Sequence, residues 1–207
     1  MRPYEEQLSQ SFDHLLAEAD RYFLETGKLH STLVDLAHRL DREGISYAVL
    51  GAIALARYGY QRMTVDIDLL LSPESLARFQ ELCVGRGYVP AFPGATKSFR
   101  AADTGVRIDI ITSGEYPGDG KPKPVVFPEP ERISVDLDGV KIVTLEKLIE
   151  LKLASGTSAA HRLRDLADVQ DAIRVLGLPE SFVDRLDPSV RSAYLDLWQR
   201  AQVSDAR

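Results

Sequence analysis

The sequence predicts an α/β fold: a small mixed β-sheet flanked by helices, followed by a helical C-terminal part. Two observations lead to this prediction. Within residues 45–143, short β-branched runs alternate with segments of helical periodicity. After residue 143, only helical periodicity remains. We therefore expect N-terminal helices over 1–44 that pack on a sheet-containing core over 45–143, and a helical region over 144–207.

The N-terminal elements are predicted from apolar spacing and from glycines. Apolar residues recur at helical intervals in two stretches, and Gly27 and Gly44 are suitable ends for these helices. A short apolar run then continues through Gly51 into another helix, which Gly59 ends. In chain order, these expected elements are an amphipathic helix over 4–25, a helix over 30–43, a strand over 47–50 and a helix over 52–58.

The remaining elements follow from alternation, capping and turn residues. Ser72 is a good N-cap, and Pro73 and Glu74 suit the first turn of a helix. Prolines and glycines crowd residues 114–131, which favours an irregular loop. The expected elements are a strand over 64–71, a helix from 72 to about 85, two strands within 96–112, a hairpin over 132–143, and helices over 144–155, 159–176 and 188–202.

The composition limits the class of protein. A net charge of −6 argues against broad affinity for nucleic acid, although it permits a local basic patch. No apolar run approaches the ~20 residues that span a bilayer, and the N-terminal residues lack the apolar stretch of a secretory signal. Cys83 is the single cysteine, so no internal disulfide can form. We expect a cytoplasmic protein with no membrane contact.

Two aspartates one residue apart are the most informative feature. In the run from Thr64 to Leu71, Asp66 and Asp68 fall on one face of a strand, opposite an apolar face. Like charges on one face repel, whereas a divalent cation would offset both and take their oxygens as ligands. Asp109 lies on a second β-branched run, facing away from its apolar neighbours. If the two strands are neighbours, three carboxylates converge, as two-metal phosphoryl chemistry requires. The alternative is a solvated strand edge with Asp109 paired to Arg107.

Two further patterns could contact a phosphate. The turn at Gly51-Ala52 joins a strand to a helix, where outward-pointing amides can hold an anion. On the 144–155 helix, Lys152 continues the inward apolar stripe, so it either reaches a phosphate or lies along the edge of the stripe. The next helix presents one polar face, formed by His161, Arg164, Asp165 and Asp168. The alternative for that face is a solvated Arg164–Asp168 pair.

These motifs together resemble the nucleotidyltransferase superfamily related to DNA polymerase β, and more narrowly its AbiEii toxin-like branch. The resemblance covers residues 45–175 and rests on two motifs. The first is Gly-x-x-Ala-Leu followed by Arg-x-Thr-x-Asp-Ile-Asp-Leu. The second is a helix lysine followed by Arg-Asp-x-x-Asp. Their residues here are Gly51, Ala54, Leu55, Arg62, Thr64, Asp66, Ile67, Asp68 and Leu69, then Lys152, Arg164, Asp165 and Asp168.

The resemblance implies a reaction and a set of site residues. An NMP would pass from an NTP to an acceptor hydroxyl with release of pyrophosphate. Catalysis would depend on two Mg²⁺ ions, with Mn²⁺ as the alternative ion. In that arrangement Asp66, Asp68 and Asp109 would be the catalytic and metal-binding residues. The implied nucleotide-binding residues are Gly51, Ala52, Arg62, Thr64, Lys152, Arg164 and Asp165.

The sequence departs from the family at one position and leaves the acceptor open. Family members have Gly-Gly or Gly-Ser where this chain has Gly51-Ala52, and alanine lacks the hydroxyl and tolerates positive φ poorly. The toxin-like resemblance implies a tRNA acceptor and a cognate antitoxin protein, whereas related enzymes modify small molecules or proteins. A non-catalytic module that binds a nucleotide or a partner is the competing interpretation.

Overall fold

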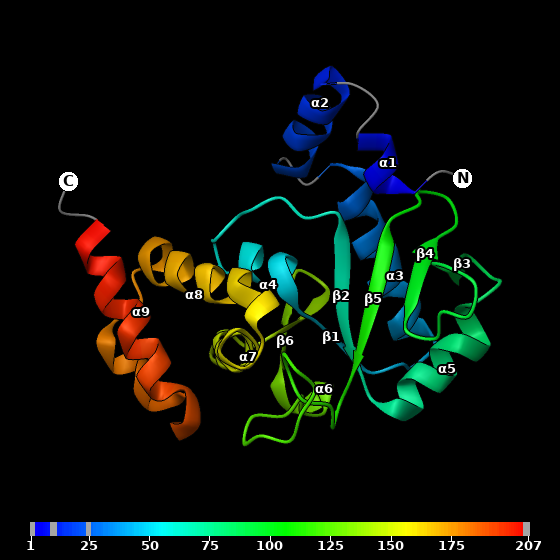
Figure 1. The fold of residues 1–207 in the computed structure, drawn as a ribbon. Coiled ribbons are helices and arrows are strands. Elements are labelled where there is room, and N and C mark those ends of the chain that lie inside the picture. Colours follow the sequence, from blue (N-terminus) through cyan, green and yellow to red (C-terminus); the bar gives the residue numbers. More distant parts are fainter. Residues whose placement is uncertain (1–2, 9–11, 24–25, 205–207) are drawn as a thin grey trace.

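The computed structural model describes residues 3–8, 12–23 and 26–204, and it confirms the expected α/β architecture (Figure 1). A seven-stranded mixed sheet has the strand order β3-β4-β5-β2-β1-β7-β6. Its strands are β1 (Tyr47–Val49), β2 (Asp66–Leu71), β3 (Tyr88–Pro90), β4 (Ser98–Ala101), β5 (Arg107–Thr112), β6 (Ser134–Leu137) and β7 (Val140–Val143).

Helices flank this sheet and form the C-terminal part of the chain. The α-helices are α1 (Tyr4–Leu8), α2 (Phe12–Phe23), α3 (Lys28–Arg42), α4 (Gly51–Arg57), α5 (Pro73–Cys83), α6 (Pro130–Ile133), α7 (Leu145–Ser158), α8 (Leu163–Leu176) and α9 (Arg191–Ser204). Short 3₁₀ segments are η1 (Ala160–Arg162), η2 (Glu180–Arg185) and η3 (Pro188–Val190). Within the described residues, no helix combines the length and the apolar character needed to cross a bilayer.

The central pair of strands, β2 and β5, runs parallel, and its register aligns Asp68 with Asp109. Alternation then gives the pair two different faces. Ile67 and Ile108 are fully buried on one face, and such side chains each contribute about 1.5–3 kcal/mol relative to exposure. The aspartates lie on the other face. The apolar face therefore fixes the register, and the register places the carboxylates.

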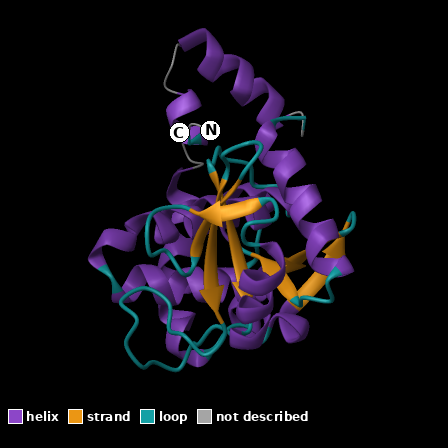
Figure 2. Cartoon of the chain, turned by 90° about the vertical axis from the view of Figure 1, so that its right-hand side faces the viewer, coloured by secondary structure: helices purple, strands orange, loops and turns teal. Residues whose placement is uncertain are grey.

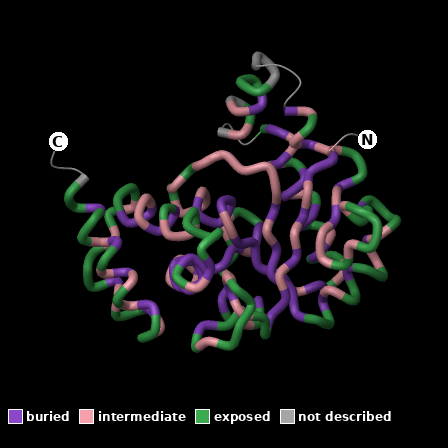
Figure 3. Tube along the Cα trace, viewed as in Figure 1, coloured by how far each residue is buried: buried purple, intermediate pink, exposed green. Residues whose placement is uncertain are grey.

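Helices lie on both sides of the sheet (Figure 2). Helix α3 contacts β2 and β7, and α5 contacts β2 and β5, whereas α4 contacts β2 and packs on α7. Helix α7 packs on α8, and α8 packs on α9. All three helices lie to the left of β2 in Figure 1. The most buried segments are the central strands and α7, while the outer faces of α8 and α9 are exposed (Figure 3).

The structure corrects several details of the expected elements. The stretch 4–25 contains two described helices, α1 and α2, rather than one, and residues 9–11 and 24–25 lie outside the described part. Leu15 and Leu16 of α2, two of the apolar residues that predicted an amphipathic helix here, are exposed. Strand β3 was not expected from the sequence, because it is three residues long, ends in a proline and follows Gly85 and Gly87.

Two further corrections concern the second half of the chain. The loop 114–131 contains the start of α6, a single turn that begins at Pro130. The helix expected over 159–176 begins as the 3₁₀ turn η1 and becomes α-helical at Leu163. The hairpin over 132–143 and the pair of strands within 96–112 are confirmed.

Candidate active site

Three aspartates lie together on neighbouring parallel strands. Asp68 and Asp109 are register partners, and Asp66 lies two residues before Asp68 on the same face of β2. The sequence analysis expected the three carboxylates to converge if the two strands were neighbours, and β2 and β5 are neighbours. The bond from Leu50 N to Asp68 O, at 2.9 Å, brings the start of α4 against this part of β2.

Gly51 makes room for the Asp68 carboxylate. A Cβ at this position would lie 2.0 Å from Asp68 Oδ2 and 3.0 Å from Asp68 Cγ. The φ angle of Gly51 is +67°, a conformation that glycine adopts without strain. Ala52 is not among the described residues with positive φ, so the departure from the Gly-Gly pattern places no strain on its backbone.

The Asp68 carboxylate is in an unfavourable electrostatic environment. Burial, the largest cause, together with the charges of Asp66 and Asp109 raises its pKa to about 6, although Lys152 and Arg162 act in the opposite direction. No described residue gives the Asp68 side chain a hydrogen bond or an ion pair. An aspartate with two acidic neighbours and no partner is a suitable ligand for a cation.

The other two aspartates already have partners. Arg107 Nη2 donates to Asp66 Oδ2 at 2.9 Å, and Arg107 Nε lies 2.9 Å from Asp109 Oδ2. The remaining oxygens accept hydrogen bonds of 2.6 Å from two hydroxyls, Thr64 to Asp66 and Ser98 to Asp109. Among the described residues, no group of three or more acidic, histidine or cysteine side chains forms a ready metal cage.

A buried ionic cluster lies beside the aspartates. Arg62 donates to both oxygens of Asp168, through Nε at 2.7 Å and Nη2 at 2.9 Å. Lys152 Nζ donates to Asp168 at 2.7 Å and to Asp165 at 2.9 Å. Ser155 donates to the other oxygen of Asp165 at 2.6 Å. The cluster joins the segment before β2 to both α7 and α8.

The charge state of this cluster follows from its contacts. Burial alone would raise the pKa of Asp168, but hydrogen bonds from Arg62 and Lys152 outweigh it and hold that pKa below its usual range. For Arg62, burial lowers the pKa and the hydrogen bond to Asp168 more than restores it. Arg62 and Asp168 are therefore both charged near neutral pH, and most donors of Arg62 are engaged within the protein.

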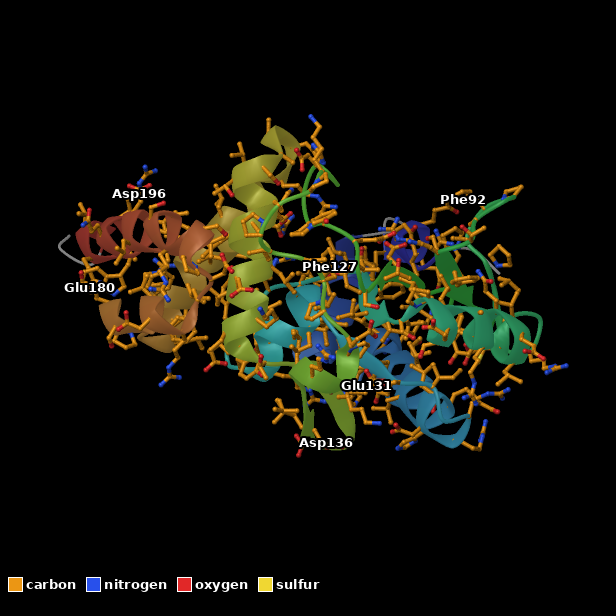
Figure 4. The ribbon with its side chains drawn as sticks, turned by 90° about the horizontal axis from the view of Figure 1, so that it is seen from below. Phe92, Phe127, Glu131, Asp136, Glu180 and Asp196 are labelled. Atoms are coloured by element: carbon orange, nitrogen blue, oxygen red, sulfur yellow. The ribbon has the colours of Figure 1, made fainter. Side chains whose placement is uncertain are left out.

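A cleft of about 910 Å³ brings the candidate residues together. All ten residues named from the sequence line it: Gly51, Ala52, Arg62, Thr64, Asp66, Asp68, Asp109, Lys152, Arg164 and Asp165. The 114–131 loop supplies another wall through Tyr116 and Phe127. Phe127 lies centrally between the sheet and the C-terminal helices in the view from below (Figure 4). The volume is in the range of small-ligand sites.

The free arginines in the described part of the cleft include one that was expected, Arg164, and one that was not, Arg162. The side chains of Arg162 and Arg164 are exposed, line the cleft and make no ion pair or hydrogen bond with the described residues. Sequence reasoning missed Arg162, because it stands outside both motifs and lies in the 3₁₀ turn η1. The solvated Arg164–Asp168 pair does not form, since Asp168 is 2% exposed and binds Arg62 and Lys152 instead. Leu163, between Arg162 and Arg164, is exposed as well.

Comparison with solved structures identifies the fold. A nucleotidyltransferase-like protein from Paracoccidioides brasiliensis matches with a TM-score of 0.51 at 15% identity, over 85% of this chain and 90% of its own. ANT(2″)-Ia, crystallised with adenylyl-2″-tobramycin, matches with a TM-score of 0.50 at 15% identity, over 80% of this chain and 94% of its own. The chain has the nucleotidyltransferase fold. No family model matches the chain, and neither does any curated protein sequence.

The residues present fit a divalent cation, which this fold implies. A nucleotidyltransferase fold with three carboxylates on one sheet face offers the hard oxygen ligands that Mg²⁺ and Mn²⁺ take. Asp68 is the clearest candidate ligand, because nothing in the described chain offsets its charge directly. Asp66 and Asp109 are the other two candidates, and Arg107 contacts both of them.

Proposed function

We propose that this protein transfers a nucleoside monophosphate from an NTP to an acceptor hydroxyl, with release of pyrophosphate. One observation carries the proposal: Asp66, Asp68 and Asp109 meet on one face of adjacent parallel strands, within a cleft of about 910 Å³. The nucleotidyltransferase fold supports it. In this proposal the three aspartates hold two divalent ions, Mg²⁺ or Mn²⁺. Bound ions would offset the charge of the triphosphate and acidify the acceptor hydroxyl.

The chain itself binds and orients the substrates. Gly51 and Ala52, at the start of α4, line the cleft, and their amides are our candidate donors to the terminal phosphates. Arg162 and Arg164 supply free positive charge on the opposite wall. Lys152 keeps one donor beyond its two hydrogen bonds, and its charge acts on Asp68.

Arg62, Thr64 and Asp165 take a supporting role in this proposal. The Arg62 guanidinium is bound to Asp168, the Thr64 hydroxyl to Asp66, and Asp165 to both Lys152 and Ser155. These contacts hold the catalytic strand and the helices in place around the nucleotide. In this proposal, the three residues support nucleotide binding by positioning other side chains, and none of them contacts a phosphate itself.

The proposal specifies that the acceptor carries a hydroxyl group, and three classes of acceptor are compatible with it. The AbiEii-like motifs favour tRNA, with an antitoxin protein as a partner and the cytoplasm as the location. The neighbour crystallised with adenylyl-2″-tobramycin favours a small molecule, and a protein acceptor is the third class. The acidic chain, with Arg162 and Arg164 as a local pair of free arginines in the described part of the cleft, agrees with a small acceptor at least as well as with RNA.

The test is transfer of label from each α-³²P-labelled NTP, with Mg²⁺, to RNA, protein or small molecules of a bacterial extract. We expect label in one of these classes, and its loss in Asp66→Ala and Asp109→Asn. Asp103→Asn, an exposed acid that does not line the cleft, is the control and should transfer normally. Mg²⁺-dependent NTP binding without transfer to any acceptor would favour the non-catalytic binding module instead.

A further inference from the structure

Arg107 occupies the centre of the carboxylate group. It is the register partner of Asp66 across β2 and β5, and it precedes Asp109 by two residues on the same face. Its guanidinium is therefore placed between two carboxylates, with a 2.9 Å hydrogen bond to Asp66 and a 2.9 Å ion pair to Asp109. One side chain thus offsets two of the three charges that the sequence assigns to metal ions.

The contacts leave no free oxygen on these two aspartates. Thr64 and Ser98 donate to the oxygens that Arg107 does not contact. Asp68, by contrast, receives no donor from the described residues. A cation that uses all three carboxylates must first displace Arg107 from Asp66 and Asp109.

The contacts of Arg107 are weak enough for a divalent cation to replace its guanidinium on Asp66 and Asp109. The side chains of Arg107, Asp66 and Asp109 are 38%, 23% and 32% exposed, so water screens both pairs, and such pairs contribute little to stability. The Nε–H of Arg107 is buried and lacks hydrogen-bond geometry despite its short distance to Asp109. The Arg62–Asp168 pair differs, because both nitrogens of Arg62 are well aligned on a carboxylate that is 3% exposed.

We propose that Arg107 is a built-in counter-cation that competes with divalent ions for Asp66 and Asp109. The inference rests on the proposed function, since it takes these aspartates as metal ligands. Metal binding releases the guanidinium into the cleft, which Arg107 also lines. The oxygens of a triphosphate can receive it there, so nucleotide and metal bind with positive coupling. Without nucleotide, Arg107 keeps the site poorly loaded with metal.

The test measures the binding of Mn²⁺ alone to the full chain, by calorimetry and by electron paramagnetic resonance. We expect Arg107→Gln to bind Mn²⁺ about tenfold more tightly than the wild type, as the loss of two exposed ion pairs implies. Arg107→Lys keeps the charge but cannot span both carboxylates, so it should bind about threefold more tightly. This second variant decides the question if Arg107→Gln does not fold.

Arg100→Gln is the matched control. Arg100 is the register partner of Arg107 on the neighbouring strand, but it binds Glu5 rather than the three aspartates. Its removal deletes the same charge from the same sheet face, and Mn²⁺ affinity should stay at the wild-type value. An equal gain in Arg100→Gln would mean that net charge, rather than competition by Arg107, limits metal binding, and would overturn the inference.

Asp68→Asn distinguishes a failure of the metal site from a failure of the role assigned to Arg107. If Asp68→Asn weakens Mn²⁺ binding while neither Arg107 variant tightens it, the metal site stands and the role of Arg107 is wrong. If Asp68→Asn and the wild type bind Mn²⁺ equally, or if no variant binds it, the carboxylates are not the metal site. The proposed function and this inference then fail together.

Discussion

Arg62 and Asp168 are 106 residues apart in sequence, yet two hydrogen bonds of 2.7 and 2.9 Å join them in a buried pair. Asp168 also accepts a hydrogen bond from Lys152 at 2.7 Å. This contact ties the segment that leads into β2 to helix α8. The aspartate strand and the helical C-terminal part therefore share one ionic anchor at the edge of the cleft.

Asp168→Asn should destabilise the protein by about 3–5 kcal/mol, because it leaves two cations beside a neutral amide in a buried site. Urea unfolding followed by circular dichroism measures the change. Asp196→Asn is the control on α9, where an exposed pair with Arg200 is worth about 0–1 kcal/mol. Equal losses in the two variants would show that the anchor contributes no more than a surface ion pair.

The same anchor makes stability depend on acid. The folded pKa of Asp168 lies below its unfolded value, near 3.9, so at acidic pH the folded state binds fewer protons than the unfolded state does. The stabilisation is complete above that unfolded pKa and is lost as the pH falls through the folded pKa. The difference in unfolding free energy between wild type and Asp168→Asn should therefore be constant from about pH 8 to 5 and shrink below about pH 4. A difference that persists at the lowest pH would contradict this assignment.

Gly51→Ala should affect activity more than stability. The new Cβ would meet the Asp68 carboxylate, which can rotate away at modest energetic cost, and positive φ adds about 1–2 kcal/mol of strain. Gly114→Ala has the same kind of strain at φ +84° and nothing within 4 Å. We expect similar unfolding free energies for the two variants, but a loss of transfer on the order of 10²-fold in Gly51→Ala alone.

A transfer assay with both alanine variants at saturating NTP checks this prediction. Near-normal transfer by Gly51→Ala would mean that the position of the Asp68 carboxylate is not critical. Reduced transfer by Gly114→Ala would instead point to general disturbance of the fold. Both readings require the unfolding measurement beside the assay.

Arg162→Gln and Arg164→Gln should each weaken NTP binding by about tenfold, the loss expected for one charge-assisted hydrogen bond. Both side chains line the cleft without a partner in the described chain. Arg174→Gln, on the same helix but outside the cleft, should bind NTP normally. Titration with a fluorescent NTP analogue gives the dissociation constants. Unchanged affinity in both cleft variants would leave the triphosphate to the Gly51–Ala52 amides and Lys152.

Local patterns in the sequence were sufficient for much of the site. Alternation along 64–71 placed Asp66 and Asp68 on one face, and the same alternation placed Asp109 opposite Ile108. These predictions hold because strand geometry fixes side-chain direction within two residues. Pattern reasoning failed for β3, where three residues give too short a pattern, and for the start of the 159–176 helix, which is a 3₁₀ turn.

The sequence by itself determined the α/β class and ten of the residues that line the cleft, because periodicity and turn residues act over short distances. Only the tertiary structure decided which charges meet. It paired Arg62 with Asp168, Lys152 with Asp165, and Arg107 with two aspartates, and it left Arg162 and Arg164 free. Ion pairs between distant segments depend on how strands and helices pack. The spacing of residues along the sequence does not predict that packing.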